Sequence, residues 1–438
     1  LHRRRHSFPT RRSSDLSIRT RHTHKNEKRY LEDFNFQLNL LSNFSKVLII
    51  VYSSLPCNNM GGIYLHIPFC KQACSYCNFH FSTLIRYKEE VLKAMHQELE
   101  IRKNFFSSEM IIESIYFGGG TPSLLTIDEI NGFIQHIQQL FSVGTQAEIT
   151  LEANPDDLTK EYLIQIKEQT IINRFSIGVQ SFHEEDLQYM NRAHHASEAL
   201  QCIQFAKQIG FHNLSIDLIY GTPTMNDEQW RQNLHTAFAL DIPHISCYAL
   251  TVEGKTALES EIKKHKKTAP TDERMVQQFS ILLEEMQKHQ YLQYEISNFC
   301  KEGFFAFHNT NYWKGIPYLG IGPSAHSYDG KNRYWNIANN TIYTQKIIAK
   351  EFSFETENLS KTNRYNEYIM TAIRTMYGVN SEKIKNDFGE EYLQHFMLEV
   401  SPFMDNKWIK NLNNIYTLTN VGKLFCDYIS ENLFIIED

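Results

Sequence analysis

Hydrophobic and polar residues follow two periods that alternate along residues 60–250. Six short, β-rich apolar stretches predict strands, at residues 62–67, 113–118, 147–153, 173–179, 213–220 and 244–250. Between them, stretches of helical period predict helices, near residues 84–105, 126–141, 158–169, 183–190, 196–209 and 226–239. In the first of these helices, Val91, Met95 and Leu99 fall on one face at intervals of four residues, which is typical of an amphipathic helix.

Six β/α units in series imply a parallel sheet with helices outside it. Because the crossovers between parallel strands share one hand, such a sheet curls into a barrel or part of one. We therefore predict an α/β fold with a partial (β/α)6 TIM-like barrel over residues 60–300. A complete eight-stranded barrel and an open doubly wound sheet are the alternatives.

The remaining residues are expected to form two further parts. Residues 301–354 include the segment Gly320–Ser327, which is expected to close the barrel. Residues 355–438 predict a smaller helical domain, with an amphipathic helix at 363–376, a hairpin near Tyr416–Thr419 and a last helix over 420–432. Thr419 and Asn420 are a plausible N-cap for that last helix.

Each predicted strand ends in residues that are able to carry chemistry. The strand ends are the loop with Cys70, Cys74 and Cys77, then Gly118–Pro122, Glu152–Pro155, Gly178–Ser181, Asp217 with Gly221–Pro223, and Ala249–Thr251. In β/α barrels the functional residues lie in the loops that follow the strands. The coincidence predicts one site at this end of the barrel.

The three clustered cysteines predict a metal site. The other five cysteines, at 57, 202, 247, 300 and 426, stand singly, which suits the reducing conditions of a cytoplasmic protein. Thiols as close as Cys70, Cys74 and Cys77 then favour metal binding over disulfide formation. Zinc needs four ligands, and His80 could supply the fourth. A [4Fe–4S] cluster on three cysteines would keep one iron open.

Two carboxylates and a glycine run are further candidates. Asp217 interrupts an apolar strand, and a buried carboxylate is costly unless it is bonded, so it should face a polar ligand in the barrel mouth. Glu152 either favours the start of the helix near residue 158 or binds a ligand. Gly118–Pro122 either forms a tight turn or lets the backbone approach a ligand closely.

Charge is distributed unevenly along the chain. The net charge is −6, but residues 1–30 carry ten Lys and Arg against two Asp and Glu, a local +8 that leaves −14 for residues 31–438. An acidic body argues against nucleic acid as a partner. No apolar run approaches the length of about 20 residues that spans a bilayer, which leaves only transient contact with a membrane surface. Residues 1–59 are expected to be non-native or disordered, with Met60 as the start; an Arg-rich transit peptide is the alternative.

Several phrases in residues 62–330 resemble a known family. They are Y-L-H-I-P-F-C from Tyr64, Y-F-G-G-G-T-P from Tyr116, R-F-S-I-G-V-Q-S-F from Arg174 and D-L-I-Y-G-T-P from Asp217. The spacing C-x3-C-x2-C, with Tyr76 before the last cysteine, resembles the radical S-adenosylmethionine (SAM) signature. Together these phrases are similar to those of the oxygen-independent coproporphyrinogen III oxidase family of radical SAM proteins, whose smaller C-terminal domain is helical and winged-helix-like.

The resemblance implies a set of cofactor contacts. Cys70, Cys74 and Cys77 would hold a [4Fe–4S] cluster whose open iron takes the amino and carboxylate groups of SAM. The residues that match the family's SAM contacts are Tyr64, Gly119, Gly120, Thr121, Glu152, Gln180, Arg192, Asp217 and Ala249.

Two features point to one branch of the family. Its oxidases resemble one another in a fourth cysteine two residues after the third, where this chain has Phe79. The phrase His308–Trp313 matches the H-N-x-x-Y-W signature of the haem-chaperone branch. The match implies haem contact through His308, Asn309, Tyr312 and Trp313; histidine is a common axial ligand of haem iron. The alternative is an aromatic-rich turn in which Tyr and Trp only pack.

The resemblance implies a haem chaperone that passes haem to an unidentified acceptor protein. The enzyme alternative is oxidative decarboxylation of coproporphyrinogen III to protoporphyrinogen IX, with SAM cleaved at the reduced cluster. A third alternative, from the cysteines alone, is a structural protein stabilised by zinc.

Overall fold

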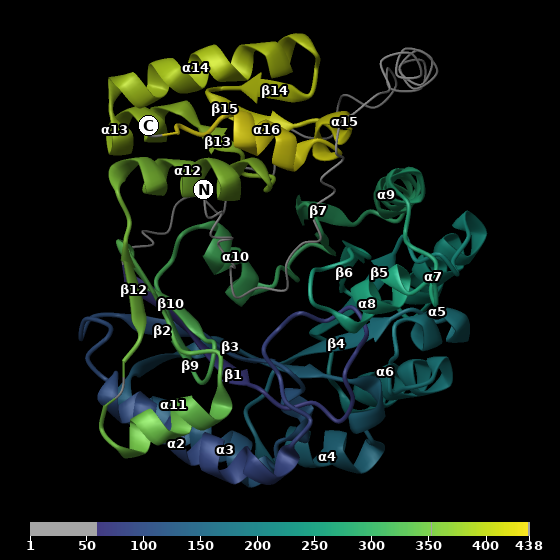
Figure 1. The fold of residues 1–438 in the computed structure, drawn as a ribbon, viewed down its shortest axis with the longest axis vertical. Helices are drawn as coiled ribbons and strands as arrows, with labels where there is room; N and C mark the ends of the chain where they lie inside the picture. The colour runs from purple at the N-terminus through teal and green to yellow at the C-terminus, as the bar shows by residue number, and fades with distance from the viewer. Residues whose placement is uncertain (1–58, 352, 437–438) are drawn as a thin grey trace.

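The computed structural model describes residues 59–351 and 353–436. The predictions made for residues 1–58 lie outside this described part of the chain. At its centre is a 12-stranded sheet in the order β12-β11-β10-β9-β1-β2-β3-β4-β5-β6-β8-β7. Figure 1 shows this sheet with helices packed along its outer side and the C-terminal helices above it.

The middle of the sheet consists of six neighbouring parallel strands, and each corresponds to a predicted strand. They are β1 (Met60–Ile67), β2 (Ile111–Gly119), β3 (Ser142–Ala153), β4 (Arg174–Gln180), β5 (Leu214–Tyr220) and β6 (His244–Ala249). The helices between them are α2 (Lys88–Ile101), α3 (Ile127–Leu140), α4 (Lys160–Gln169), α5 (Glu184–Tyr189), α6 (Ala196–Ile209) and α7 (Asp227–Ala239). The predicted series of six β/α units is therefore confirmed.

Each of these strands has one apolar and one polar face, because successive side chains point to opposite sides of a sheet. In β1, Ile63 and Leu65 are fully buried in the core between the sheet and the outer helices. Tyr64 points the other way, into a polar chamber on the concave side. Side chains of β1 and β6 line the same chamber, so the sheet curls back on itself. It is a partial barrel, as predicted, and neither alternative topology is formed.

The strands at both ends of the sheet are short. Beyond β6 lie α8 (Ala257–Lys263), α9 (Asp272–Lys288), β7 (Leu292–Glu295) and β8 (Asn298–Cys300). The segment that follows forms α10 (Phe307–Trp313), β9 (Tyr318–Ile321), β10 (His326–Tyr328), β11 (Asn332–Trp335), α11 (Asn340–Ile348) and β12 (Glu355–Asn358). Because β9 pairs in parallel with β1, this segment extends the barrel on its first side.

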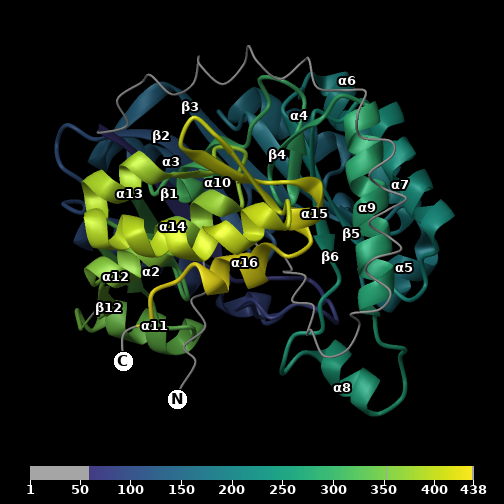
Figure 2. The ribbon, with the colours of Figure 1, turned by 90° about the horizontal axis from the view of Figure 1, so that it is seen from above.

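The C-terminal region has a core of its own, built on Tyr365, Ile369, Phe396 and Ile429. Its elements are α12 (Lys361–Ile373), β13 (Val379–Asn380), α13 (Ser381–Phe388), α14 (Glu390–Asp405), β14 (Ile409–Leu412), β15 (Ile415–Leu418), α15 (Asn420–Lys423) and α16 (Cys426–Asn432). The three strands form a small antiparallel sheet. The Thr419 hydroxyl accepts a bond from the backbone N–H of Gly422, the N-cap that the sequence predicts. Figure 2 shows these helices lying across the barrel when it is seen from above.

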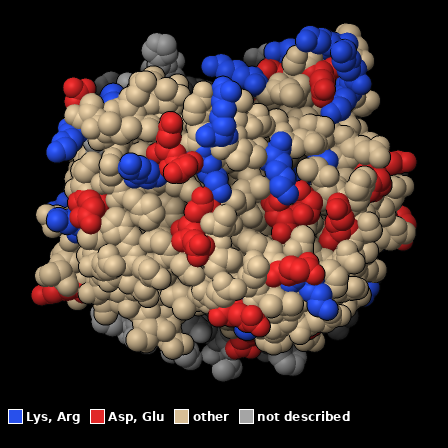
Figure 3. Space-filling model, turned by 90° about the horizontal axis from the view of Figure 1, so that it is seen from below, with Lys and Arg blue, Asp and Glu red and all other residues tan. Residues whose placement is uncertain are grey.

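The opposite face of the molecule is formed largely by the outer helices. Figure 3 shows basic and acidic side chains intermixed on this face, beside a broad area that carries few charges. Lys88 of α2 and Glu129 of α3 form an ion pair of 2.7 Å between two of these helices. Throughout the described residues, none of the helices combines the length and the apolar character that crossing a bilayer requires.

Candidate functional site

The cysteine loop leaves the end of β1 and is held by one backbone bond within itself and by backbone bonds to two other segments. The Cys70 N–H donates to Ser82 O at 3.1 Å, which closes the loop on itself. At its centre, the Ser75 N–H donates to Met190 O at 3.0 Å, and Ser75 O accepts from Leu258 N–H at 2.7 Å. Met190 follows α5 and Leu258 lies in α8, so the loops after β4 and β6 both fix the cysteines.

The glycine run after β2 supports the start of the same loop. The N–H of Gly120 donates to Ile67 O at 2.9 Å, and that of Thr121 donates to Phe69 O at 2.7 Å. A Cβ at Gly120 would lie 2.6 Å from Phe69 O, closer than such atoms approach each other. Gly119 has φ +108°, which favours glycine. The run therefore brings two backbone segments together, next to Cys70.

Replacing Gly120 by alanine is expected to push the cysteine loop away from β2, because the added methyl meets a backbone carbonyl. Overpacking of this kind costs about 1–3 kcal/mol of folding free energy. We expect a lower urea midpoint, measured by circular dichroism, and less iron retained after anaerobic reconstitution. Gly254→Ala is the matched control, because no atom lies within 4 Å of a Cβ built there. Equal iron content in the two variants would contradict the role given to Gly120.

The spacing of the three thiols discriminates between the two metals. Ligands of one tetrahedral zinc ion lie about 3–4 Å from one another, because each is only about 2.0–2.3 Å from the metal. In the described part of the chain, no three of Cys70, Cys74, Cys77 and His80 have donor atoms that all lie within 4.8 Å of one another. His80 Nε2 lies instead 2.6 Å from Asn340 Oδ1. This arrangement does not fit a closed zinc site on these four residues, whereas three thiols are a donor set that fits a [4Fe–4S] cluster with one open iron.

Arg192 connects the cysteine loop with two strand ends. Its Nη1 donates to Cys74 Sγ at 3.1 Å, and its Nη2 donates to Asn154 Oδ1 and Gly178 O, each at 2.8 Å. Its Nε is buried and has no hydrogen-bond partner among the described residues. A guanidinium with a donor to spare beside a candidate metal ligand suits a site for an anionic group, such as a carboxylate.

The concave side of the barrel encloses a polar chamber, to which every central strand contributes. Its lining includes, in strand order from β1 to β6, Tyr64, Tyr116, Glu152, Ser176, Asp217 and Ser246. The Tyr116 hydroxyl donates to Glu152 Oε1 at 2.8 Å. Glu152 therefore faces the chamber and not the start of α4. Asp217, 1% exposed, also faces it, as the interrupted apolar strand indicates.

The chamber is closed by α10, which carries the H-N-x-x-Y-W phrase. His308 is 2% exposed, and its ring stacks on Tyr116 with centroids 5.0 Å apart. Both ring nitrogens are bonded: Nδ1 lies 2.8 Å from Ser114 Oγ, and Nε2 lies 2.8 Å from the Tyr312 hydroxyl. Burial lowers the pKa of His308 to about 3, so the imidazole is neutral. The phrase forms a short helix where the packing alternative expects a turn.

The other predicted residues occupy two places. Asn309, Tyr312 and Trp313 line the chamber together with His308, and the buried Trp313 Nε1 has no partner within the described residues. Gln180 and Ala249 are buried at the ends of β4 and β6, outside the chamber lining. Gln180 has φ +67°, a strained conformation for a residue with a side chain, which is typical of functional loops.

Three residues of the site escaped the sequence analysis. Asn154 bonds both Arg192 and Thr121, and Ser114 holds His308. His66 is hydrogen-bonded to the Tyr64 hydroxyl at 3.1 Å and to His80 O at 3.0 Å, so it links the chamber to the cysteine loop. Ser114 and Tyr116 stand two positions apart in a predicted strand; this polar alternation was the available signal.

Comparison with known proteins agrees with this geometry. The model of the Radical SAM superfamily matches residues 64–237, which contain the second half of β1, the cysteine loop and β2–β5. The solved structure of coproporphyrinogen III oxidase (HemN) from Escherichia coli superposes with a TM-score of 0.75, covering 86% of this chain and 91% of that one. At 20% identity this likeness concerns the fold alone. Fold, cysteine loop and family model define a radical SAM protein.

Curated relatives narrow the class to one family. A protein of Bacillus subtilis named heme chaperone HemW is 31% identical over 368 residues, which cover 83% of this chain and 97% of the relative. The protein of the same name from Haemophilus influenzae is 30% identical over 385 residues, covering 86% of this chain and 98% of the relative. The chain belongs to the HemW family.

Proposed function

We propose that this protein is a haem chaperone: it binds haem, passes it to an acceptor protein, and carries a [4Fe–4S] cluster with SAM at the open iron. The observation that carries the proposal is the position of the H-N-x-x-Y-W helix α10, which closes the chamber of a radical SAM barrel. Membership of the HemW family supports the same conclusion.

Cys70, Cys74 and Cys77 are proposed as the cluster ligands. Burial raises the pKa of the Cys70 thiol to about 11. The thiol is therefore protonated at neutral pH, and iron must displace that proton when it binds. Arg192 places positive charge beside Cys74, which must bind iron as a thiolate. When bound, the cluster and SAM supply one-electron chemistry.

The strand ends around the cysteine loop are proposed to hold SAM. Glu152 and Asp217 offer carboxylates to hydroxyl or amino groups, and Arg192 offers a spare donor to a carboxylate. The further proposed contacts are Tyr64, Gly119, Gly120, Thr121, Gln180 and Ala249.

Haem is proposed to bind at α10 on His308, Asn309, Tyr312 and Trp313. The free volume of the chamber is about 30 Å³, room for about two water molecules and far too little for a porphyrin. His308 must therefore exchange one of its two ring bonds, and α10 must shift, before the imidazole reaches haem iron. Gly303 and Gly315, with φ +85° and +67°, stand on either side of α10 and provide flexible points for that movement.

Replacing His308 by alanine is expected to weaken haem binding at least tenfold, because the axial nitrogen is lost. Replacing Tyr312 by phenylalanine frees Nε2 of His308 and should leave haem binding equal or tighter. Both affinities are measured by haem titration of the full chain, followed in the Soret band. Unchanged affinity in His308→Ala would remove the assigned haem ligand.

The oxidase reaction is tested in the same preparations. Phe79 stands where the oxidases of the wider family resemble one another in a fourth cysteine. We therefore expect no protoporphyrinogen from coproporphyrinogen III when reconstituted protein, SAM and a reductant are incubated anaerobically. Sustained turnover would replace the chaperone assignment by the enzyme.

A further inference from the structure

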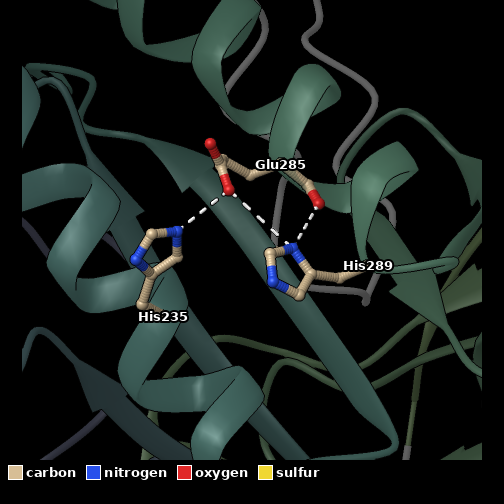
Figure 4. Close-up of side chains that lie close together, drawn as sticks. All are labelled: His235, Glu285 and His289. Carbon is tan, nitrogen blue, oxygen red and sulfur yellow. Dashed lines mark hydrogen bonds and ion pairs between the residues drawn. The ribbon is translucent and has the colours of Figure 1, made fainter.

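Three side chains with metal-binding groups meet in the outer helix layer, outside the chamber. His235 comes from α7, Glu285 from α9, and His289 directly follows the last residue of α9 (Figure 4). Their donor atoms all lie within 4.8 Å of one another, which holds for no other such group in the described residues. His235 Nε2 is 3.0 Å from Glu285 Oε2, and His289 Nδ1 is 3.8 Å from the same oxygen. Two imidazoles thus converge on one carboxylate oxygen.

The carboxylate is oriented from its other side. The Glu285 side chain is 3% exposed, and Arg231 Nη1 donates to its Oε1 at 2.6 Å. Oε2 is therefore the oxygen turned to the histidines, and a ligating carboxylate is commonly oriented by such a second bond. Burial alone would raise the pKa of Glu285, but the bond from His235 and the charges of Lys288 and Arg231 outweigh it and lower that pKa. Glu285 is ionised at neutral pH.

The surroundings also suit a cation. Glu285 and His289 are one helical turn apart, so α9 itself fixes their separation. The His289 ring stacks on Phe238 with centroids 3.9 Å apart, which fixes its plane. The site lies within a turn of the C-terminal ends of α7 and α9, where helix dipoles favour positive charge.

The simpler explanation is a surface ion-pair network, because Arg231 already pairs with Glu285 and, at 3.6 Å, with Glu284, and Lys288 Nζ lies 3.9 Å from Glu285 Oε1. Every cation in that network faces Oε1 or Glu284. Among the described residues, Oε2 is paired only with the imidazoles of His235 and His289. The ion-pair network therefore explains the partners of Glu285 Oε1. It does not explain why two histidines face Oε2, whereas a bound metal would.

We propose that His235, Glu285 and His289 bind a divalent transition metal of the zinc type. Two imidazoles and a carboxylate, with a water in the open position, form a known three-ligand zinc set. The side chains of His235 and His289 are 53% and 34% exposed, so metal and water reach the site from solvent. On binding, His289 Nδ1 exchanges its 2.9 Å contact with the backbone carbonyl of Glu285 for the metal.

Such a metal would act as a clamp between two helices. α7 and α9 lie side by side in both ribbon views, and Trp230 Nε1 of α7 donates to Gln278 O of α9 at 2.9 Å. A metal on His235 and His289 would join the same helices nearer their C-terminal ends. A ligand that binds only the folded state raises its stability, so bound zinc should raise the melting temperature.

The experiment is a zinc titration of the full chain, carried out anaerobically after cluster reconstitution and in competition with a chromophoric chelator. Wild-type protein is expected to bind one equivalent more tightly than the His235→Ala/His289→Ala double variant, by at least about tenfold. Zinc should raise the melting temperature of the wild type only. Both imidazoles are partly exposed, so the variant is expected to fold, which circular dichroism checks.

His195→Ala is the matched control. His195 is exposed and lies 2.7 Å from a single carboxylate, that of Glu184, but it belongs to no three-ligand group. It should bind zinc as the wild type does. Any zinc that binds to the thiols would be the same in the wild type, the double variant and His195→Ala, so it does not affect the difference in zinc binding between them. Equal affinity and equal melting shifts in the wild type and the double variant would overturn the proposal.

Discussion

Replacing Cys74 by serine is expected to abolish the iron–sulfur cluster. Three thiolates are the only protein ligands proposed for it, and a serine hydroxyl is a poor ligand for iron in a sulfur-rich cluster. The substitution also removes the sulfur atom to which Arg192 donates at 3.1 Å. After anaerobic reconstitution, we expect about four irons and four sulfides per wild-type chain, and almost none in the variant. The measurements are chemical analysis of iron and sulfide, and the broad absorption at about 400 nm.

Cys202→Ala is the control for this experiment. Cys202 is 2% exposed, between α6 and the sheet, so its loss leaves a small cavity that costs about 1 kcal/mol but touches no proposed ligand. It should retain all of its iron. Reconstituted wild-type protein that contains neither iron nor sulfide, and that binds zinc through the three thiols, would refute the cluster. The SAM site, which depends on the open iron, would be lost with it.

Acid is expected to destabilise the protein well before its carboxylates titrate. Burial lowers the pKa of His66 and His194 to about 4, from an ordinary value of 6.5. That of His308 falls to about 3, and that of His244 lies well below its ordinary value, for the same reason. All four side chains are neutral in the fold at neutral pH. The unfolded chain therefore takes up protons first as the pH falls.

The direction in which stability changes with pH follows from the linkage between proton binding and folding. Because the folded pKa values are depressed, the stability from neutral histidines is fully present above about pH 6.5 and is lost as the pH falls towards 4. At pH 5.5 each histidine costs about 1.4 kcal/mol, and the four together cost about 5.6 kcal/mol. That is comparable with the whole stability of many domains, about 5–15 kcal/mol.

Urea unfolding at pH 7.5, 6.5 and 5.5 measures this loss. His194→Gln is the informative variant, since it removes one of the four titrating groups and should lower the number of protons taken up on unfolding by about one. A free energy of unfolding that stays constant from pH 7.5 to 5.5 would show that these histidines are not neutral through burial.

Periodicity identified the central strands and helices because the hydrophobic pattern of each element is contained in its own residues. In β5, Leu214, Ile216 and Leu218 alternate onto one face. This alternation predicts the strand, and it predicts that Asp217 lies on the opposite face. The strands β7–β12 were not predicted. They have three or four residues each, which is too short for a period to be read, and they are defined by pairing with distant partners.

The candidate site divides in the same way. The spacing of Cys70, Cys74 and Cys77 is enough to predict a metal site, because the three thiols are already close together in the sequence. Arg192 has no such local signature: a lone arginine in a sequence is most often solvated. Only the family resemblance made it a candidate in the sequence, and its contacts with Cys74 and Asn154 depend on the fold.

By itself, the amino-acid order determined which segments of residues 60–250 are strands or helices, which strand faces are polar, and which loop is the candidate for metal binding. Only the tertiary structure decided that Ser114 holds His308, 194 residues away, and that His235 meets Glu285 on the neighbouring helix. The physical reason is range. Side-chain direction along one element is set by local backbone geometry, whereas contacts between elements depend on how the whole sheet curls and its helices pack, which no short stretch of residues encodes.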